Sequence, residues 1–208
     1  PPPAGPSTHG PADEPAPAGI RLSALAGVQF KLSALRSGDR FSLPVGPDGS
    51  WILKFEGQGF DGLSEVEAAT MQWACLSGLE VPRFEVVPPS AIDAHGASLP
   101  DSPALFAIER FDRAPSGLRV HQEDFAQALE LKPRYKYGGT GKRAISYDGV
   151  ARLVADAAGP TGLAEFVRRM AFVIGSGNAD AHLKNWTFQW SDGAAAPSLS
   201  PCYDQVAT

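Results

Sequence analysis

The spacing of apolar residues changes at about Asp112, and this change limits the possible folds of the 208-residue chain more than any other feature. Before Asp112, short segments rich in β-branched and aromatic residues predict strands, and one longer segment with helical spacing predicts a single helix. After Asp112 the spacing is mainly helical. The sequence therefore predicts an α+β protein with a strand-rich first half and a helix-rich second half.

Turn signals and capping residues place the elements of the first half. Strands are expected at residues 40–45, 51–55, 83–87 and 104–111, and the turn "GPDGS" joins the first two. A helix is expected over residues 64–78, where Ser64 can cap the start and Gly78 can cap the end. One face of this helix carries the apolar residues of an amphipathic pattern, which are Val66, Ala69, Trp73 and Leu76.

The second half is expected to hold several helices and one hairpin. The helices are predicted at residues 121–131, 147–159 and 161–175, and the hairpin at residues 185–190 and 198–204. The first nineteen residues are nearly all Pro, Ala, Gly and small polar residues, which cannot bury enough apolar area to offset the entropy of ordering. The expected division is a flexible tail at 1–19, a first unit at 20–112 and a second at 113–208.

Composition excludes some classes of function. The net charge of −5 gives no basic field for binding nucleic acid directly. No apolar run approaches the roughly 18 residues that a membrane span requires. The two cysteines, Cys75 and Cys202, together with the lack of a visible signal peptide, favour reduced thiols in the cytoplasm. Because the chain starts without Met, its first residue is expected to be either an engineered boundary or a processing boundary.

The segment "NADAHLKN" at residues 178–185 gathers many polar groups directly after an apolar helix. Asp180 and Asn185 have the D-x-x-x-x-N spacing of phosphoryl-transfer loops, in which the Asp accepts the proton of the attacking hydroxyl and the Asn binds a metal ion. Asp204 follows nineteen residues after Asn185, across the expected hairpin, and supplies a second oxygen ligand suited to Mg²⁺. The alternative is that these residues only form caps and turns.

A lysine that faces a phosphate group is expected on an early strand. In "WILKF", Lys54 and Ile52 lie on the strand face opposite to Trp51, Leu53 and Phe55. Glu67 on the following helix is the expected acidic partner of Lys54, with Glu65 in reserve. The alternatives are an exposed lysine and a capping box between Ser64 and Glu67.

The segments "LAGVQFKLS", "WILKF", "SGLEVP", "AIERFDR", "HQEDFAQAL", "NADAHLKN" and "PCYD" together resemble the HipA family of serine/threonine kinases, over residues 22–208. The resemblance implies a bilobal, protein-kinase-like fold related to lipid kinases, with a strand-rich N-lobe and a helix-rich C-lobe. It implies ATP and Mg²⁺ as cofactors and phosphorylation of a protein serine, typically on an aminoacyl-tRNA synthetase, which slows translation and growth. It also implies a helix-turn-helix antitoxin as partner, through which the toxin meets DNA indirectly.

The resemblance also implies roles for individual residues. Asp180 corresponds to the catalytic base, Asn185 and Asp204 to the metal ligands, and Lys54 to the phosphate-binding lysine, with Glu67 as its partner. The segment "LAGVQFK" corresponds to the loop over the phosphates, and the backbone from Glu109 to Phe111 to the connection that meets the adenine. The remaining implied nucleotide-binding residues are Gly27, Val28, Gln29, Lys31, His182 and Lys184.

The sequence departs from the family pattern in two ways. Family members often carry a serine three residues before the loop glycine, and its autophosphorylation switches the kinase off. Here Ala24 takes that position and Ser23 precedes it, so we expect the loop to stay unphosphorylated. The chain is also short at both ends, and its C-lobe is expected to be completed by further residues or by a partner chain.

Two other classes of function are considered. A metal hydrolase would use Asp180, His182 and a second histidine, but the other histidines lie in the tail, in a loop and at a predicted helix start. A catalytically incomplete kinase fragment would bind ATP or an antitoxin without turnover. The segment "YGGTGKR" at residues 137–143 resembles a Walker A loop but lacks its first Gly and its final Ser or Thr.

Overall fold

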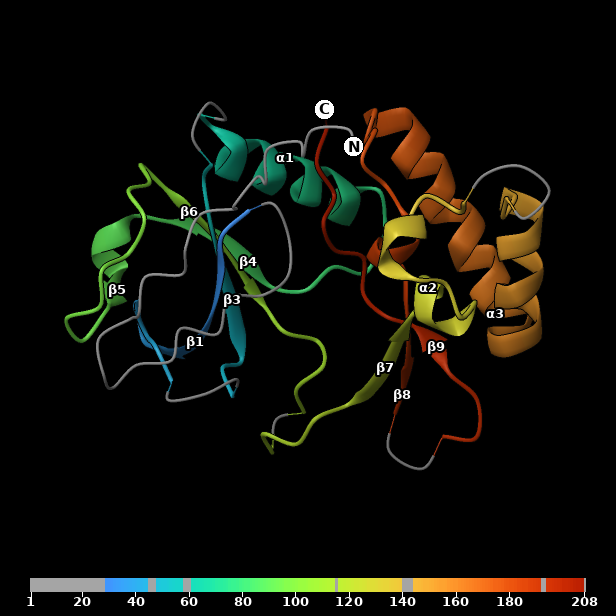
Figure 1. The fold of residues 1–208 in the computed structure, drawn as a ribbon, viewed down its shortest axis with the longest axis horizontal. Helices are drawn as coiled ribbons and strands as arrows, with labels where there is room; N and C mark the ends of the chain where they lie inside the picture. The colour runs from blue at the N-terminus through green and yellow to red at the C-terminus, as the bar shows by residue number, and fades with distance from the viewer. Residues whose placement is uncertain are drawn as a thin grey trace, which may run out of the picture.

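The computed structural model describes residues 29–44, 48–57, 61–114, 116–139, 144–191 and 194–207. A six-stranded sheet with one helix across it forms the N-terminal part, and a small sheet packed against a long helix forms the C-terminal part (Figure 1). This arrangement confirms the mixed α+β class. The division of the chain at residue 112 stays a proposal.

The large sheet has the strand order β4-β6-β3-β1-β2-β5, and only the β2–β5 pair is parallel. Its strands are β1 Lys31–Ser37, β2 Arg40–Ser42, β3 Trp51–Phe55, β4 Phe84–Val87, β5 Ile92–Asp93 and β6 Leu105–Glu109, with a 3-10 turn η1 at Pro89–Ala91. The sequence predicted that β2 leads through a turn into β3, but β1 lies between these strands in the sheet. The connection passes close to β1 at Gly49, where a Cβ atom would come within 2.5 Å of the Ala34 backbone nitrogen.

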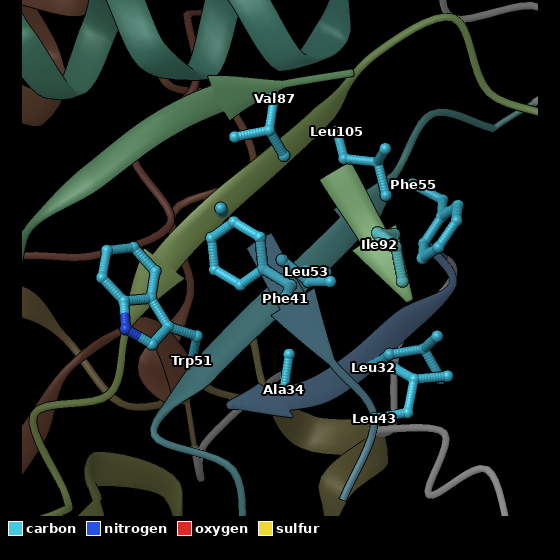
Figure 2. Packing of buried hydrophobic residues seen from close by; sticks show 11 residues of the cluster. Leu32, Ala34, Phe41, Leu43, Trp51, Leu53, Phe55, Val87, Ile92 and Leu105 are labelled. Carbon is cyan, nitrogen blue, oxygen red and sulfur yellow. The ribbon is translucent and has the colours of Figure 1, made fainter. Parts of the chain in front are cut away.

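The two faces of the sheet carry different side chains, as the alternation along β3 predicted. Trp51, Leu53 and Phe55 point into one apolar cluster, which Figure 2 shows together with Phe41 from β2. The opposite face packs against the helix α1 (Leu63–Leu76) through Met71 and through apolar residues of β6. Lys54 lies on this second face, so it points toward α1.

Helix α1 begins and packs differently from the expectation. Gly62 precedes it with a φ of 80°, and the Glu56 carboxylate accepts the backbone N–H groups of Gly62 and Ser64 at 3.2 and 2.9 Å. The Ser64 hydroxyl therefore does not cap the helix, because a carboxylate from the preceding segment satisfies the free amides. At the other end Gly78 has a φ of 81° and ends the helix as predicted.

The face of α1 that was expected from its apolar residues is not the face that packs. Trp73 is 48% exposed and Leu76 is 78% exposed. The buried face instead carries Ser64, Glu67, Thr70, Met71 and Ala74. Hydrophobic spacing fails here because the helix turns a carboxylate toward the sheet to meet Lys54.

The C-terminal part holds a three-stranded antiparallel sheet in the order β7-β8-β9. Its elements are β7 His121–Asp124, α2 Phe125–Ala128, η2 Pro133–Tyr135, α3 Tyr147–Ser176, η4 Leu183–Asn185, β8 Thr187–Trp190 and β9 Ser198–Leu199. The hairpin of β8 and β9 is confirmed. The helix predicted at residues 121–131 was wrong for its first four residues, because Asp124 is extended and caps a helix that starts only at Phe125. It was also wrong for its last three residues, because the helix ends at Ala128 and Glu130 has a φ of 52°.

Helix α3 runs through both helices that the sequence predicted separately, with a kink between them. Gly159 has φ 67° and ψ −168° at the kink, and Pro160 follows it. The two halves close around one apolar cluster that includes Phe125, Phe166 and Phe188. No helix in the described residues is long and apolar enough to cross a membrane.

The segment 200–207 joins the two parts. Cys202 donates its backbone N–H to the Glu80 carbonyl at 2.7 Å, and Ala207 donates to the Thr70 hydroxyl at 3.2 Å. Figure 1 shows this last segment running beside α1, far from β8 and β9 where it started. The N-terminal part therefore binds the segment on both sides of Asp204, at Cys202 and at Ala207.

Candidate active site

A cleft of about 450 Å³ lies between the two parts of the molecule. The N-terminal part contributes Lys31, Ile52, Lys54, Ile108, Glu109, Arg110 and Phe111 to its wall, and the rest of the chain contributes Asp112, Gln122, Asp124, Gln127, Lys184, Thr187, Tyr203 and Asp204. Five of the residues expected at a nucleotide site therefore share one cleft with one expected metal ligand.

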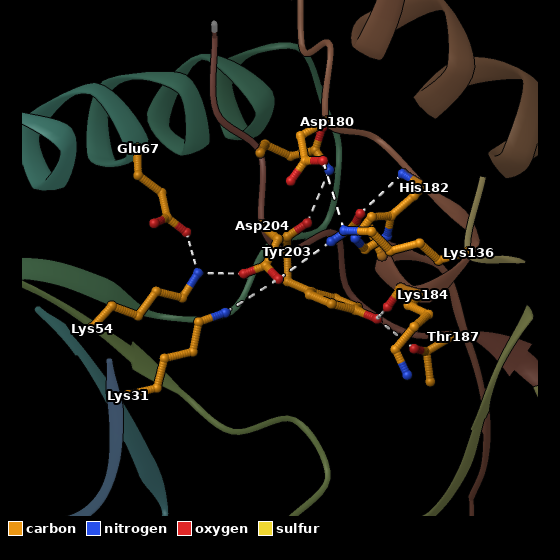
Figure 3. Close-up of polar contacts among 12 residues, drawn as sticks. Lys31, Lys54, Glu67, Lys136, Asp180, His182, Lys184, Thr187, Tyr203 and Asp204 are labelled. Atoms are coloured by element: carbon orange, nitrogen blue, oxygen red, sulfur yellow. Dashed lines mark hydrogen bonds and ion pairs between the residues drawn. The ribbon is translucent and has the colours of Figure 1, made fainter. Parts of the chain in front are cut away.

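A buried ion cluster lies at one end of this cleft. The Lys54 ammonium is 2.5 Å from Glu67 Oε1 and also contacts Asp204 Oδ1 (Figure 3). Lys54 and Glu67 are almost fully buried. Glu67 is thus committed to the ion pair, which excludes the alternative of a capping box with Ser64.

The charges of this cluster shift the pKa values of its members. Burial alone would lower the pKa of Lys54, but the carboxylates of Asp204 and Glu67 outweigh burial and raise it above the ordinary value. Burial alone would raise the pKa of Asp204, but Lys54 and Lys31 lower it to about 2. Burial raises the pKa of Glu67 despite its contact with Lys54. Asp204 is therefore the carboxylate that stays ionised most firmly.

The backbone at Asp204 adopts a conformation that few non-glycine residues adopt, with a φ of 52°. The Asn178 side chain donates to the Asp204 carbonyl at 3.4 Å. The neighbouring Tyr203 hydroxyl donates to the Lys184 carbonyl at 2.9 Å and lies 2.6 Å from the Thr187 hydroxyl. These contacts fix the direction of the Asp204 side chain into the cleft.

The loop at residues 178–185 begins after Gly177, whose φ of 71° ends α3. Asn185 connects this loop to the cluster, because its Nδ2 donates to Asp204 Oδ2 at 3.3 Å. Its Oδ1 accepts the backbone N–H of His182 at 3.0 Å. The structure thus brings together the two residues that were expected to share a metal ion.

Asp180 lies outside the ion cluster. Its side chain is 65% exposed, and its Oδ1 accepts a hydrogen bond from the Tyr137 hydroxyl at 2.5 Å and lies 4.0 Å from the Lys136 ammonium. Sequence reasoning placed Lys136 and Tyr137 only at the edge of a glycine-rich connection. No local signal identified them, because Tyr137 is 43 residues away from Asp180.

Lys31, His182 and Lys184 flank the cluster. The Lys31 ammonium is 3.8 Å from Asp204 Oδ2. Lys184 pairs with Asp124 at 3.0 Å on the wall of the cleft. Burial, followed by the nearby Lys136 charge, lowers the pKa of His182. Lys31 and Lys184 thus add two cationic groups to the cleft.

The backbone at residues 109–111 connects the two parts, and two of its N–H groups are already hydrogen-bonded to carbonyl groups of the protein. Glu109 donates its N–H to the Arg83 carbonyl and Arg110 donates to the Ser50 carbonyl, each at 2.8 Å. The Phe111 ring packs at 5.2 Å from the Tyr203 ring. An adenine at this connection would therefore meet carbonyl groups and the backbone of Phe111 in preference to the two engaged amides.

Part of the expected phosphate loop lies outside the described residues. The residues outside the described ranges include Gly27 and Val28 of this loop and Ser23 and Ala24 before it. Their expected roles therefore stay predictions. Gln29 is described and directly precedes the strand of Lys31. The hydrolase alternative lacks a geometric basis, because the described residues contain no group of three His, Cys, Asp or Glu side chains placed to hold a metal ion.

Comparisons with known proteins show the family to which the chain belongs. The family description that matches residues 23–208 is that of the HipA-like C-terminal domain. The curated protein named "Putative kinase Y4dM" from Sinorhizobium fredii is 38% identical over 94% of this chain and 47% of its own length. The serine/threonine-protein kinase toxin HipA from Shewanella oneidensis is 31% identical over 90% of this chain and 43% of its own length. The chain spans about half the length of the curated relatives it matches.

Solved structures share the fold. The structure of HipA from Shewanella oneidensis MR-1, in a complex with HipB and operator DNA, matches 91% of this chain and 45% of its own, with a TM-score of 0.70 and 28% identity. The proinflammatory kinase CtkA from Helicobacter pylori has a TM-score of 0.57 at 16% identity, covers 88% of this chain and 55% of its own, and shows the fold alone. Because the family description matches residues 23–208, the chain belongs to the HipA-like C-terminal domain family.

Proposed function

We propose that this chain is the catalytic core of an ATP- and Mg²⁺-dependent protein kinase that phosphorylates serine or threonine hydroxyls. The observation that carries the proposal is the single cleft in which Lys54, paired with Glu67, contacts Asp204 while Asn185 holds the other oxygen of Asp204. A buried lysine paired in this way is the arrangement with which kinases bind nucleotide phosphates. The N-terminal part and the C-terminal part would then correspond to the two lobes of a kinase.

The proposal places the nucleotide between the connection at residues 109–111 and the cation pair. Ile52 and Ile108, which pair across β3 and β6, offer apolar surface for a base. Lys31 and Lys54, which pair across β1 and β3 two residues farther along β3, offer positive charge for phosphates in the same cleft. Burial of Lys54 strengthens this attraction, since charges interact more strongly where water is excluded. Gly27 and Val28 are proposed to cover the phosphates.

The donor groups at Asp204 and Asn185 fit magnesium. Mg²⁺ prefers oxygen ligands and usually takes only one or two carboxylates from the protein, with water and phosphate oxygens completing its shell. The firmly ionised Asp204 carboxylate meets this preference. Asn185 donates its Nδ2 to Asp204 in this structure, so its side chain would have to rotate to present the amide oxygen to the ion. The ion, when bound, neutralises charge that develops on the phosphate oxygens.

The proposed step transfers one phosphoryl group. The substrate hydroxyl oxygen forms a bond with the γ-phosphorus of ATP, and the bond between that phosphorus and the β–γ bridging oxygen breaks, so ADP leaves with the electron pair. Asp180 accepts the proton that the hydroxyl loses. The exposure of Asp180 leaves room for a hydroxyl that belongs to a large protein substrate.

The partner and the substrate are proposed from the relatives. HipA of Shewanella oneidensis was solved with HipB and operator DNA, so we propose a DNA-binding antitoxin as the partner of this chain. An aminoacyl-tRNA synthetase is the proposed class of substrate. A comparison of phosphorylated proteins in cells that express the wild type or the Asp180→Asn variant identifies the substrate directly.

The central test is Asp180→Asn. We expect phosphate transfer from labelled ATP to a heat-treated bacterial protein extract to fall about a hundredfold or more, while the affinity for ATP stays unchanged, because only the proton acceptor is lost. The control is Asp156→Asn on the exposed side of α3. Transfer by Asp180→Asn at the wild-type rate would refute the assignment.

A second test separates a kinase from a module that only binds ATP. Asp204→Ala removes the only charged group of the proposed metal pair, so calorimetry should show a larger loss of Mg²⁺-dependent ATP affinity than for Asn185→Ala. ATP binding by the wild type without any phosphate transfer would favour the module.

A further inference from the structure

A short segment after η2 lies against the loop that carries Asp180. The Lys136 carbonyl accepts the backbone N–H of Leu183 at 2.9 Å. The Tyr137 hydroxyl donates to Asp180 Oδ1 at 2.5 Å, and the Tyr137 ring meets the edge of the His182 ring at a centroid distance of 5.5 Å. Backbone, hydroxyl and ring of this segment thus each contact the proposed catalytic loop.

The turn after Tyr137 fixes the direction of its side chain. Gly138 has a φ of 89°, donates its N–H to the Tyr135 carbonyl at 2.8 Å and accepts the Ile145 N–H at 2.7 Å. A Cβ atom at Gly138 would lie 3.1 Å from the Ile145 carbonyl oxygen. Both the positive φ and this close approach require glycine. Tyr137 therefore leaves a constrained turn, although its side chain is 62% exposed.

The two oxygens of Asp180 have different surroundings. Tyr137 and Lys136 both approach Oδ1, from a hydroxyl and an ammonium group. The described residues provide no such contact to Oδ2, and the Asp180 side chain as a whole is 65% exposed. A carboxylate held through one oxygen presents the other in a fixed direction, and proton transfer requires the acceptor within hydrogen-bond reach of the substrate hydroxyl.

We infer that Tyr137 is a positioning residue for the Asp180 carboxylate: it holds Oδ1 so that Oδ2 faces the hydroxyl of the protein substrate. This inference rests on the proposed kinase function. Lys136 assists by placing its positive charge near the same oxygen. Tyr137, the first residue of the segment that resembled a Walker A loop, therefore serves the proton acceptor.

The test is Tyr137→Phe, which removes the hydroxyl but keeps the ring that meets His182. With labelled ATP and the heat-treated protein extract, the transfer rate at saturating ATP should fall about tenfold or more, in line with the strength of hydrogen bonds to charged groups. The KM for ATP should stay unchanged, because Tyr137 does not line the nucleotide cleft. The control Tyr135→Phe changes a neighbouring, partly exposed tyrosine and should retain the wild-type rate.

A double variant distinguishes positioning from a merely structural role. In the Asp180→Asn background, Tyr137→Phe should cause no further loss of transfer, because the two residues act as one unit. Additive losses would overturn the inference, as would a wild-type rate for Tyr137→Phe. A faster Tyr137→Phe variant would also overturn it, by showing that the hydroxyl obstructs the substrate. Absence of transfer by the wild type itself would refute the proposed function, and this inference with it.

Discussion

At the scale of single residues, the ammonium group of Lys54 forms ion pairs with two carboxylates. Lys54 lies between Glu67 and Asp204, and burial makes each of these charges costly without its partner. A stable protein retains such a cluster only where its geometry is well satisfied. The cluster is therefore the place where stability and the proposed nucleotide binding depend on the same atoms.

Lys54→Met should lower the free energy of unfolding by about 3 kcal/mol, because it leaves a buried carboxylate without its cation. Adding Glu67→Gln should recover part of this loss, since the uncompensated charge is removed. Neither variant should bind ATP. Urea unfolding and calorimetry measure both effects, with the exposed Lys132→Met as the control. Unchanged stability of Lys54→Met would contradict the buried ion cluster.

Asp204 predicts a specific dependence of stability on pH. Its pKa is about 2 in the folded protein and 3.8 in its ordinary state. The unfolded chain therefore takes up a proton at this residue before the folded chain does, so the stabilisation is present above pH 3.8 and is lost as the pH falls toward about 2.

The measurement compares wild type with Asp204→Asn. Between pH 5 and pH 2, about the range that brackets both pKa values, the stability difference between the two proteins should shrink as the pH falls. Taking the difference removes the contributions of carboxylates remote from Asp204, whereas the raised pKa of Glu67, which acts in the opposite direction, itself depends on Asp204. A constant difference would show that Lys54 and Lys31 do not lower the pKa of Asp204.

At the scale of elements, the start of α1 depends on a residue outside the helix. Glu56→Ala should lower the free energy of unfolding by about 1 kcal/mol, as the loss of an N-terminal cap does, because the amides of Gly62 and Ser64 lose their acceptor. The exposed Glu80→Ala is the control and should change stability by less than about 0.5 kcal/mol. Chemical denaturation decides this, and equal effects at both positions would count against the cap.

The kink in α3 offers a matched pair of glycines. Gly159 has a backbone conformation that only glycine adopts readily, so Gly159→Ala should cost about 1–3 kcal/mol of stability. Gly175 has open space around its Cβ position inside the same helix, so Gly175→Ala should stabilise by about 0.5–1 kcal/mol. Opposite signs in thermal unfolding confirm that the kink is required, and a stabilising Gly159→Ala would show that it is not.

At the scale of the whole molecule, the cleft is shared by two parts with separate apolar clusters. A nucleotide bound there would contact both parts and would therefore bind only the folded chain. At a free nucleotide concentration of about one hundred times its Kd, such binding should raise the free energy of unfolding by about 2.7 kcal/mol. Thermal unfolding with ATP and Mg²⁺ measures the shift, which Asp204→Ala should abolish and Asp156→Ala should keep. No shift for the wild type would contradict nucleotide binding in the cleft.

Apolar side chains also lie on the outside of the molecule. Leu76 on α1 and Ile174 on α3 are 78% and 74% exposed. On the other side of α3, Phe166 and Val173 belong to an apolar cluster. The expectation of a larger catalytic unit stays a prediction.

The sequence by itself determined the features that depend on local backbone geometry. The alternation in β3 separates Lys54 from Trp51, Leu53 and Phe55 because successive strand residues point to opposite faces. The loop after α3 could be found because a glycine ends the helix and a fixed spacing separates Asp180 from Asn185. Short segments were therefore enough to locate Lys54 on a strand and Asp180 and Asn185 in a loop, although they gave the wrong buried face for α1.

Only the tertiary structure decided which distant segments meet. Lys54 and Asp204 are 150 residues apart, and no local pattern states that the chain end returns to α1. The same holds for the strand β1 between β2 and β3, for Glu56 at the start of α1, and for Tyr137 at Asp180. Each of these contacts forms because the packing of whole elements brings its partners within hydrogen-bond distance, and that packing depends on the entire chain at once.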